Sequence, residues 1–120
     1  MAGFKEEIAK YPEIKIVADV DGGGERDKSL KATSDVLQAH PDLDGIFGIN
    51  DDSALGALSA VKEFKRDKVV IVGYDATPEA NNAILSGSNL KADVVQYPEK
   101  IGIKTIEVVN DYLNGKKVEK

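Results

Sequence analysis

The sequence predicts an α/β domain built on a doubly wound parallel sheet, and three observations favour this fold class. First, apolar runs rich in β-branched residues occur at residues 14–20, 45–49, 69–74 and 91–95, as in buried strands. Second, the segments between these runs carry apolar residues every three or four positions, which is the period of an amphipathic helix. Third, polar residues follow the runs directly, which is typical of a corner where a strand passes into a helix.

The first half of the chain is predicted to contain two helices and one strand. Residues 3–10 favour a short amphipathic helix, because two apolar side chains four positions apart stand among charged ones. Pro12 follows that helix, and the β-branched residues of 14–20 favour a strand. A glycine-rich loop at residues 21–25 then leads to a second helix at 27–39.

The second half is predicted to repeat the strand–helix unit three times. The strand at 45–49 precedes a helix at 53–65, and the strand at 69–74 precedes a helix capped by Thr77. The last strand, at 91–95, leads into a final helix that an Asn-Gly pair ends. The order αβαβαβαβα with short connections indicates a doubly wound sheet with right-handed crossovers.

The composition describes one acidic globular domain of 120 residues, with 42% hydrophobic and 31% charged residues. A net charge of −5 argues against a nucleic-acid partner, which would select for a basic face. The chain has no cysteine, so it has no disulfide, thiolate nucleophile or cysteine-based metal site. Apolar runs are too short to span a membrane, and the first residues lack the features of a signal peptide.

Polar side chains with hydrogen-bonding amide or carboxylate groups stand at the ends of three predicted strands. Asn50, Asp75 and Gln96 follow the runs at 45–49, 69–74 and 91–95. Because the carboxyl ends of parallel strands meet at one edge, we expect these groups to converge there. Planar amides and a carboxylate supply the donors and acceptors that a neutral polyhydroxy ligand needs. Asp51 is a further candidate for contact with the ligand, whereas Asp52 is better explained as a helix cap.

The glycine-rich loop at residues 21–25 invites comparison with a phosphate-binding loop, but it lacks the required spacing and is flanked by acids. We interpret it as a flexible loop beside the cleft. Arg26, which follows it, either reaches into the site or pairs with Glu25. His40, the one histidine, precedes proline at a helix end, where capping is the usual role. No catalytic residue, metal site or cofactor is predicted, and we do not expect an enzyme.

Three stretches of the sequence carry a family resemblance: AHPDLDGIFGINDDSALGALSAV, VVIVGYDATPEA and ADVVQYPEKIGIKTIE. They resemble the carboxy-terminal lobe of ribose-type periplasmic binding proteins, the solute receptors of bacterial ABC sugar importers. The resemblance implies a lobe of the type I class, a flavodoxin-like (Rossmann-like) three-layer sandwich. It also implies that Asn50, Asp75 and Gln96 hydrogen-bond a ribose-like monosaccharide. The implied partners of the parent protein are an amino-terminal lobe and a membrane permease, and its implied location is the periplasm.

The sequence departs from the family pattern in ways that set further expectations. No aromatic residue stands in the loop at residues 21–25, where the family packs one on the sugar. We expect residues 1–120 to form a single lobe that lacks the amino-terminal lobe, a sugar-binding arginine and its own first strand. That strand would lie between residues 14–20 and 45–49, so we expect these two strands to pair directly or a second copy to associate there. We expect the isolated chain to bind sugar no better than roughly millimolar, or not at all.

Three alternatives remain open at this point. The effector lobe of a LacI-type repressor shares this architecture. A receiver-like phosphoacceptor domain would use Asp51, Asp52 and Asp75 to bind Mg²⁺, but would require a lysine where this chain has Gln96. The third alternative is that the chain is an excised or alternatively initiated fragment without a cellular function of its own.

Overall fold

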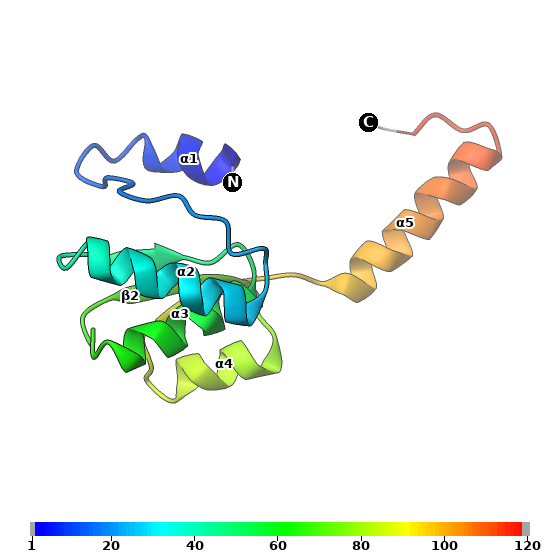
Figure 1. Cartoon of the computed structure of the whole chain (residues 1–120). Helices are drawn as coiled ribbons and strands as arrows, with labels where there is room; N and C mark the ends of the chain where they lie inside the picture. Colours follow the sequence, from blue (N-terminus) through cyan, green and yellow to red (C-terminus); the bar gives the residue numbers. More distant parts are fainter. Residues whose placement is uncertain (1, 119–120) are drawn as a thin grey trace.

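The computed structural model describes residues 2–118 and shows a three-stranded parallel sheet surrounded by helices (Figure 1). The elements are α1 (Ala2–Ile8), α2 (Arg26–Ala39), β1 (Gly45–Phe47), α3 (Asp51–Glu63), β2 (Val70–Asp75), α4 (Pro78–Leu85), β3 (Leu90–Val95) and α5 (Pro98–Leu113). The strands lie in the order β1-β2-β3. The predicted α/β class with a parallel sheet is confirmed.

The register of the sheet determines which residues lie side by side at the carboxyl ends of the strands. Phe47 of β1 lies opposite Val72 of β2, and the Gly48 amide extends this ladder by donating to the Val72 carbonyl at 2.9 Å. Asp75, the last residue of β2, lies opposite Val95, the last residue of β3. Because β2 and β3 end together, the residues that follow them emerge side by side.

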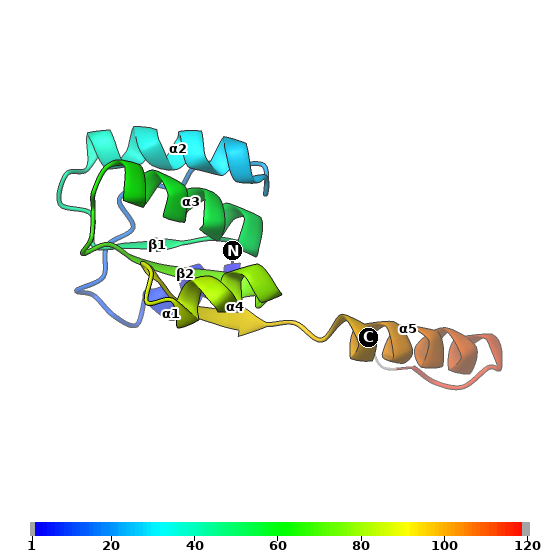
Figure 2. The same cartoon turned by 90° about the horizontal axis from the view of Figure 1, so that it is seen from below.

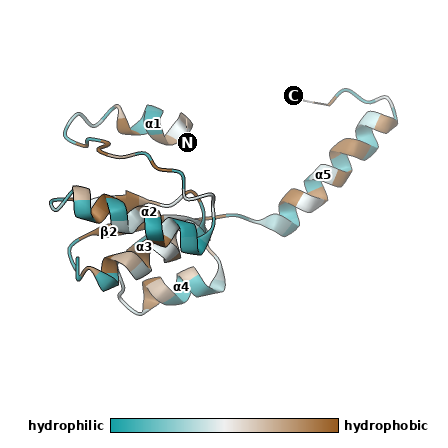
Figure 3. Cartoon of the chain, in the orientation of Figure 1, coloured by the Kyte–Doolittle hydropathy of each residue, from teal (hydrophilic) through white to brown (hydrophobic). Residues whose placement is uncertain are grey.

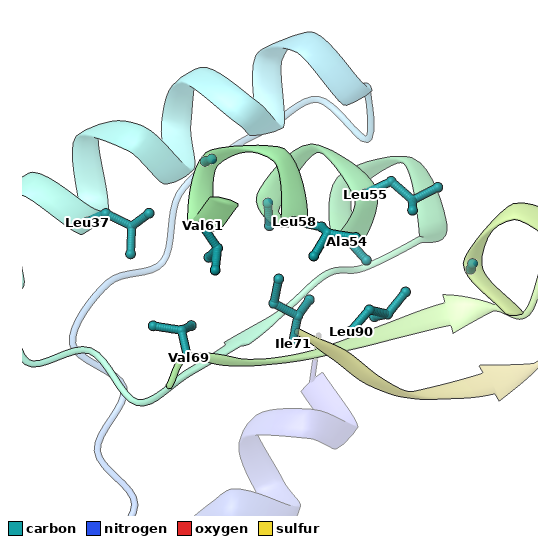
Figure 4. Packing of buried hydrophobic residues seen from close by; sticks show 11 residues of the cluster. Leu37, Ala54, Leu55, Leu58, Val61, Val69, Ile71 and Leu90 are labelled. Carbon is teal, nitrogen blue, oxygen red and sulfur yellow. The ribbon is translucent and has the colours of Figure 1, made fainter. Parts of the chain in front are cut away.

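One face of the sheet carries the hydrophobic core. Helices α2 and α3 pack against each other above β1 and β2, and α4 lies along β3 (Figure 2). The largest fully buried side chains come from α2, α3, β2 and β3: Leu37, Val61, Ile71 and Leu90 (Figure 4). These positions are apolar at helical spacing in α2 and α3 and β-branched or aliphatic in the strands. The amphipathic pattern of the sequence therefore selects this face.

Helix α1 lies on the other side of the sheet from α2 and α3 (Figure 4). Its Phe4 ring stacks on Phe47 of β1 with a centroid distance of 4.5 Å and an interplanar angle of 11°. Much of this face is open, since Val70 is 42% and Val94 is 52% exposed.

The predicted strand at residues 14–20 is wrong. The segment has no strand assignment, and no backbone hydrogen bond joins residues 14–20 to β1 in the described chain. The expected direct pairing of the two strands is therefore absent. A cavity of about 1320 Å³ separates the segment from β1 and is lined by Ile16, Val36 and Phe47 among others. β-Branched residues make a strand only when a neighbouring strand supplies backbone partners, and this segment has none.

Helix α5 extends away from the layered body (Figures 1 and 2). It contains no buried residue, although apolar residues recur along it (Figure 3). Ile106 is 70% and Tyr112 is 69% exposed. In a doubly wound arrangement each helix covers a face of the sheet, but α5 does not cover it. In the part of the chain that the structure describes, no helix combines the length and hydropathy needed to cross a membrane.

Candidate functional site

The three polar residues predicted at the strand ends lie at one edge of the sheet, where β1 to β3 pass into their helices. Asn50 lies just beyond β1 and caps α3, since its Oδ1 accepts a hydrogen bond from the Ser53 amide at 2.9 Å. Its Nδ2 donates to the Gly24 carbonyl at 3.0 Å, which ties the glycine-rich loop to β1. Both bonds use only half of the amide's capacity, because the oxygen accepts twice and the nitrogen donates twice.

Asp75 and Gln96 form a directly hydrogen-bonded pair at the ends of β2 and β3. Gln96 Nε2 donates to Asp75 Oδ1, and the Gln96 backbone amide donates to the Asp75 carbonyl at 3.3 Å. Within the described chain, Asp75 Oδ2 and Gln96 Oε1 accept no hydrogen bond from protein. These two oxygens, with the second Nε2 hydrogen, are the groups left for a ligand.

The backbone beside Asp75 adopts a conformation that L-residues rarely take. Asp75 has φ of 129° and Ala76 has φ of 57°, both in the positive region that favours glycine. The turn is held by Asp51, whose Oδ2 accepts a hydrogen bond from the Thr77 amide at 2.6 Å. Non-glycine residues with positive φ persist where the surroundings over-determine them, and they gather at binding sites.

Arg26 bridges three helices at the mouth of the site. Its guanidinium donates to both carboxylate oxygens of Glu79 at 2.8 and 2.9 Å and to Asp52 Oδ1 at 3.0 Å. The hydrogen bonds to Glu79 raise the pKa of Arg26, and those same bonds lower the pKa of Glu79. Of the two roles expected of Arg26, pairing with Glu25 is not seen, because Glu25 pairs with Lys28 at 2.7 Å.

A pocket of about 390 Å³ lies at this edge of the sheet. Its walls are Arg26, Asn50, Asp51, Asp52, Leu55, Asp75, Thr77, Pro78 and Glu79. Two of the three predicted residues line it directly, and the third, Gln96, adjoins it through Asp75. Tyr97, one residue further, is 55% exposed and lies under the Lys100 ammonium, 4.7 Å from the ring centre. Within residues 2–118, no group of three or more His, Cys, Asp or Glu side chains is placed to hold a metal ion.

Sequence reasoning missed one residue of this edge, Asp93 in β3. Its carboxyl group faces Asp51 across Gly73 of β2. Burial, the hydrogen bond with Asp51 and the charge of Asp51 raise the pKa of Asp93 to about 6. Asp51 itself is only 3% exposed. The signal was an aspartate inside the apolar run of residues 91–95, where an unpaired charge would be costly.

The chain resembles known proteins over almost all of its length. A family model described as a periplasmic binding protein domain matches residues 1–117. The ribose import binding protein RbsB of Salmonella typhimurium is 36% identical over 117 residues, which are 98% of this chain and 39% of that protein. The D-apiose import binding protein of Actinobacillus succinogenes is 37% identical over 94 residues, covering 78% of this chain and 30% of that protein. The chain thus spans about two fifths, or less, of these curated relatives.

Solved structures of sugar-binding receptors match almost the whole of this chain and less than half of their own. A periplasmic solute binding protein of an ABC transporter from Actinobacillus succinogenes, with bound D-allose, superposes with a TM-score of 0.86 and 33% identity. The match covers 98% of this chain and 42% of that one. GanP, a glucose-galactose binding protein from Geobacillus stearothermophilus, superposes with a TM-score of 0.89 and 29% identity, again over 98% of this chain and 42% of that one.

Proposed function

The chain belongs to the periplasmic binding protein domain family, and we propose that it forms one lobe of a monosaccharide receptor of an ABC importer. In this role it is a binding module and not an enzyme. The relatives described above support the ligand class, because their names specify ribose, apiose, allose, glucose and galactose. The comparisons do not favour the repressor-lobe or receiver alternatives.

The observation that carries this proposal is the hydrogen-bonded pair of Asp75 and Gln96 beside Asn50. Each sugar hydroxyl both donates and accepts, so a site for sugars needs acceptors and donors in fixed directions. Asp75 Oδ2 and Gln96 Oε1 supply acceptors, and the second hydrogens of Asn50 Nδ2 and Gln96 Nε2 supply donors. Because protein hydrogen bonds already hold these groups, little side-chain freedom is lost when a sugar binds.

Arg26 supports the site without reaching the sugar under this proposal. Among the residues that the structure describes, its guanidinium bonds only to Glu79 and Asp52, which fixes the starts of α3 and α4 relative to α2. Asp51 likewise acts from inside, since its carboxylate is buried and bound to the Thr77 amide. We therefore assign sugar contact to Asn50, Asp75 and Gln96 and support to Arg26 and Asp51.

The rest of the receptor covers surfaces that this lobe leaves open. Helix α5 has no buried residue, and in the ladder with β2 the backbone groups of Gly45 and Phe47 face away from β2 toward the cavity. The match to the solved D-allose-bound receptor covers 98% of this chain, which includes most of α5, and 42% of that receptor. We propose that another part of the receptor packs on α5 and that a further strand, or a second copy, pairs with β1. The whole receptor is then periplasmic and delivers sugar to a membrane permease.

The experiment is a titration of the labelled chain with ribose, allose and glucose, followed by nitrogen–proton NMR. We expect shifts confined to the side-chain amides of Asn50 and Gln96 and the backbone near Asp75, with affinity no better than roughly millimolar. Asp75→Asn should abolish these shifts. Asp67→Asn, at the opposite end of β2, is the matched control and should leave them unchanged. Shifts spread evenly over the surface, or identical in both variants, would contradict the proposed site.

A further inference from the structure

Two carboxyl groups face each other beneath the edge that carries the proposed site. Asp51 begins α3 and is 3% exposed, and Asp93 comes from the middle of β3. They meet over Gly73 of β2: a Cβ at residue 73 would lie 2.9 Å from Asp93 Oδ2 and 3.2 Å from Asp51 Oδ1. The glycine therefore leaves the room that both carboxyl groups occupy.

These carboxyl groups have too few donors. Asp51 Oδ2 accepts from the Thr77 amide, but Asp51 Oδ1 and both oxygens of Asp93 are inaccessible to water and have no protein donor at good hydrogen-bonding geometry among the described residues. The nearby backbone amides of Ala76 and Val94 lower the pKa of Asp93 only in part. None of the ion pairs in the described chain includes either residue. Buried acceptors without a donor are costly, and two ionised carboxylates that face each other repel.

The charged groups around the pair do not relieve this repulsion. Arg26 on α2 lines the pocket beside Asp51, and its guanidinium is bonded to Glu79 on α4 and Asp52 on α3. Glu79 and Asp52 add negative charge on the side of Asp51. The strands contribute Asp75, which is bonded to Gln96. A proton held between the two carboxyl groups removes one of the two charges and supplies a donor to the other group.

We infer that Asp51 and Asp93 share one proton, held on Asp93 and donated to Asp51 Oδ1, and that this pair positions the Asp75 turn of the sugar site. The pKa shifts agree with this assignment. Burial, the hydrogen bond with Asp51 and its charge raise the pKa of Asp93 to about 6. Burial alone would raise the pKa of Asp51, but the hydrogen bonds from Asp93 and Thr77 lower it.

The shared proton reaches the site through Thr77. Asp51 Oδ2 holds the Thr77 amide, and the residues just before it, Asp75 and Ala76, take positive φ. When Asp93 loses its proton, the two carboxylates repel each other and move apart. If the Asp51 carboxylate moves, its hydrogen bond with the Thr77 amide breaks. The turn then loses its restraint, and the Asp75 carboxylate loses its fixed direction. Sugar binding, which rests on the proposed function, is therefore stronger below the pKa of Asp93 than above it.

The first test needs no sugar. Carbon NMR of the side-chain carboxyl groups between pH 4 and 8 should show Asp93 titrating near pH 6 while Asp51 stays ionised. The Thr77 amide signal should shift with the same midpoint. Titration of Asp93 near the ordinary value of 3.8, or a Thr77 signal that ignores pH, would overturn the inference.

Asp93→Asn keeps the size and shape of residue 93 but removes its titration, so it tests the shared proton apart from packing. Its amide donates to Asp51 at every pH, so the shift of the Thr77 signal near pH 6 should disappear, whereas Asp67→Asn should keep it. If Asp93→Asn does not fold, the carboxyl titration of the unaltered chain still tests whether Asp51 and Asp93 share a proton. With ribose present, affinity should fall several-fold between pH 5 and 7.5 and be flat in Asp93→Asn. If no sugar binds while Asp93 titrates near 6 with Thr77, the proposed function fails and the proton-sharing pair stands.

Discussion

The side chain of Gln96 donates a hydrogen bond to the carboxylate of Asp75, and the backbone amide of Gln96 donates to the carbonyl of the same residue. Two strands that end at the same level thereby present a carboxylate and an amide as one rigid group. Asn50 is fixed separately, by the Ser53 amide and the Gly24 carbonyl. The geometry of the proposed site is thus largely fixed by hydrogen bonds within the protein.

Gln96→Ala should weaken sugar binding far more than it weakens the fold. The variant removes a donor and an acceptor from the ligand and frees the Asp75 carboxylate to rotate. We expect at least a tenfold loss of affinity, about 1.4 kcal/mol, and a loss of stability of about 1 kcal/mol. NMR titration and urea unfolding measure the two quantities. Gln38→Ala, on the far end of α2 and exposed, is the control; equal sugar affinity in both variants would contradict the assigned role of Gln96.

Gly73→Ala should destabilise the chain, because the new methyl group enters the space of the carboxyl pair. It would lie 2.9 Å from Asp93 Oδ2 and 3.2 Å from both Asp51 Oδ1 and Ala54 Cβ. We expect a loss of about 1–3 kcal/mol in the free energy of unfolding. Gly45→Ala in β1 is the matched control, since the nearest atom to its methyl group would be 3.5 Å away. A Gly73→Ala variant as stable as Gly45→Ala would show that the pair is not tightly packed.

The strand ends could be predicted because each depends on a local pattern. An apolar run that stops at Asn50 or Asp75 marks the edge of a parallel sheet whatever the rest of the chain does. Residues 14–20 show the limit of such patterns. Their composition is that of a strand, but strand formation depends on a neighbour that local sequence does not specify, and here a cavity lies between the segment and β1.

The carboxyl pair was beyond local reasoning for a related cause. Asp51 and Asp93 are 42 positions apart by their numbers, and they meet only because the register places Gly73 beside Asp93. The sequence predicted Asp51 as a further ligand contact next to Asn50, whereas the first turn of α3 buries its side chain. The placement of α5 was equally hidden, because an amphipathic pattern gives the apolar face of a helix and not the surface that covers it.

Stability should fall as pH rises through the titration of Asp93. The folded chain holds this proton with a pKa of about 6, against an ordinary value of 3.8, so folded molecules bind more protons than unfolded ones between these values. Unfolding therefore becomes easier as pH rises from about 4 to about 6, with a slope of at most about 1.4 kcal/mol per pH unit, and is flat above. Urea unfolding of the unaltered chain and of Asp93→Asn measures the difference. Parallel pH profiles of stability for the two proteins would show that the titration of Asp93 does not contribute to the pH dependence.

Arg26→Ala should cost about 0.5–1 kcal/mol, because the ion pairs with Glu79 and Asp52 are partly exposed and screened by water. The loss should shrink in high salt, where these pairs already contribute less. Lys28→Ala, which removes a pair within one helix turn, is the control and should cost less. Unfolding in low and in high salt provides the comparison. An Arg26→Ala effect that does not depend on salt would point to packing of the side chain as its role.

Changes on α5 should leave the stability of this chain unaltered while the same kind of change in the core destroys it. Ile106 is 70% exposed on α5, so Ile106→Ala removes no buried surface and should change the free energy of unfolding by less than about 0.5 kcal/mol. Ile71 is fully buried in β2, and Ile71→Ala should cost about 2–5 kcal/mol. Urea unfolding of both variants makes the comparison. A loss of about 1 kcal/mol or more in Ile106→Ala would show that α5 packs on another surface of this chain in solution.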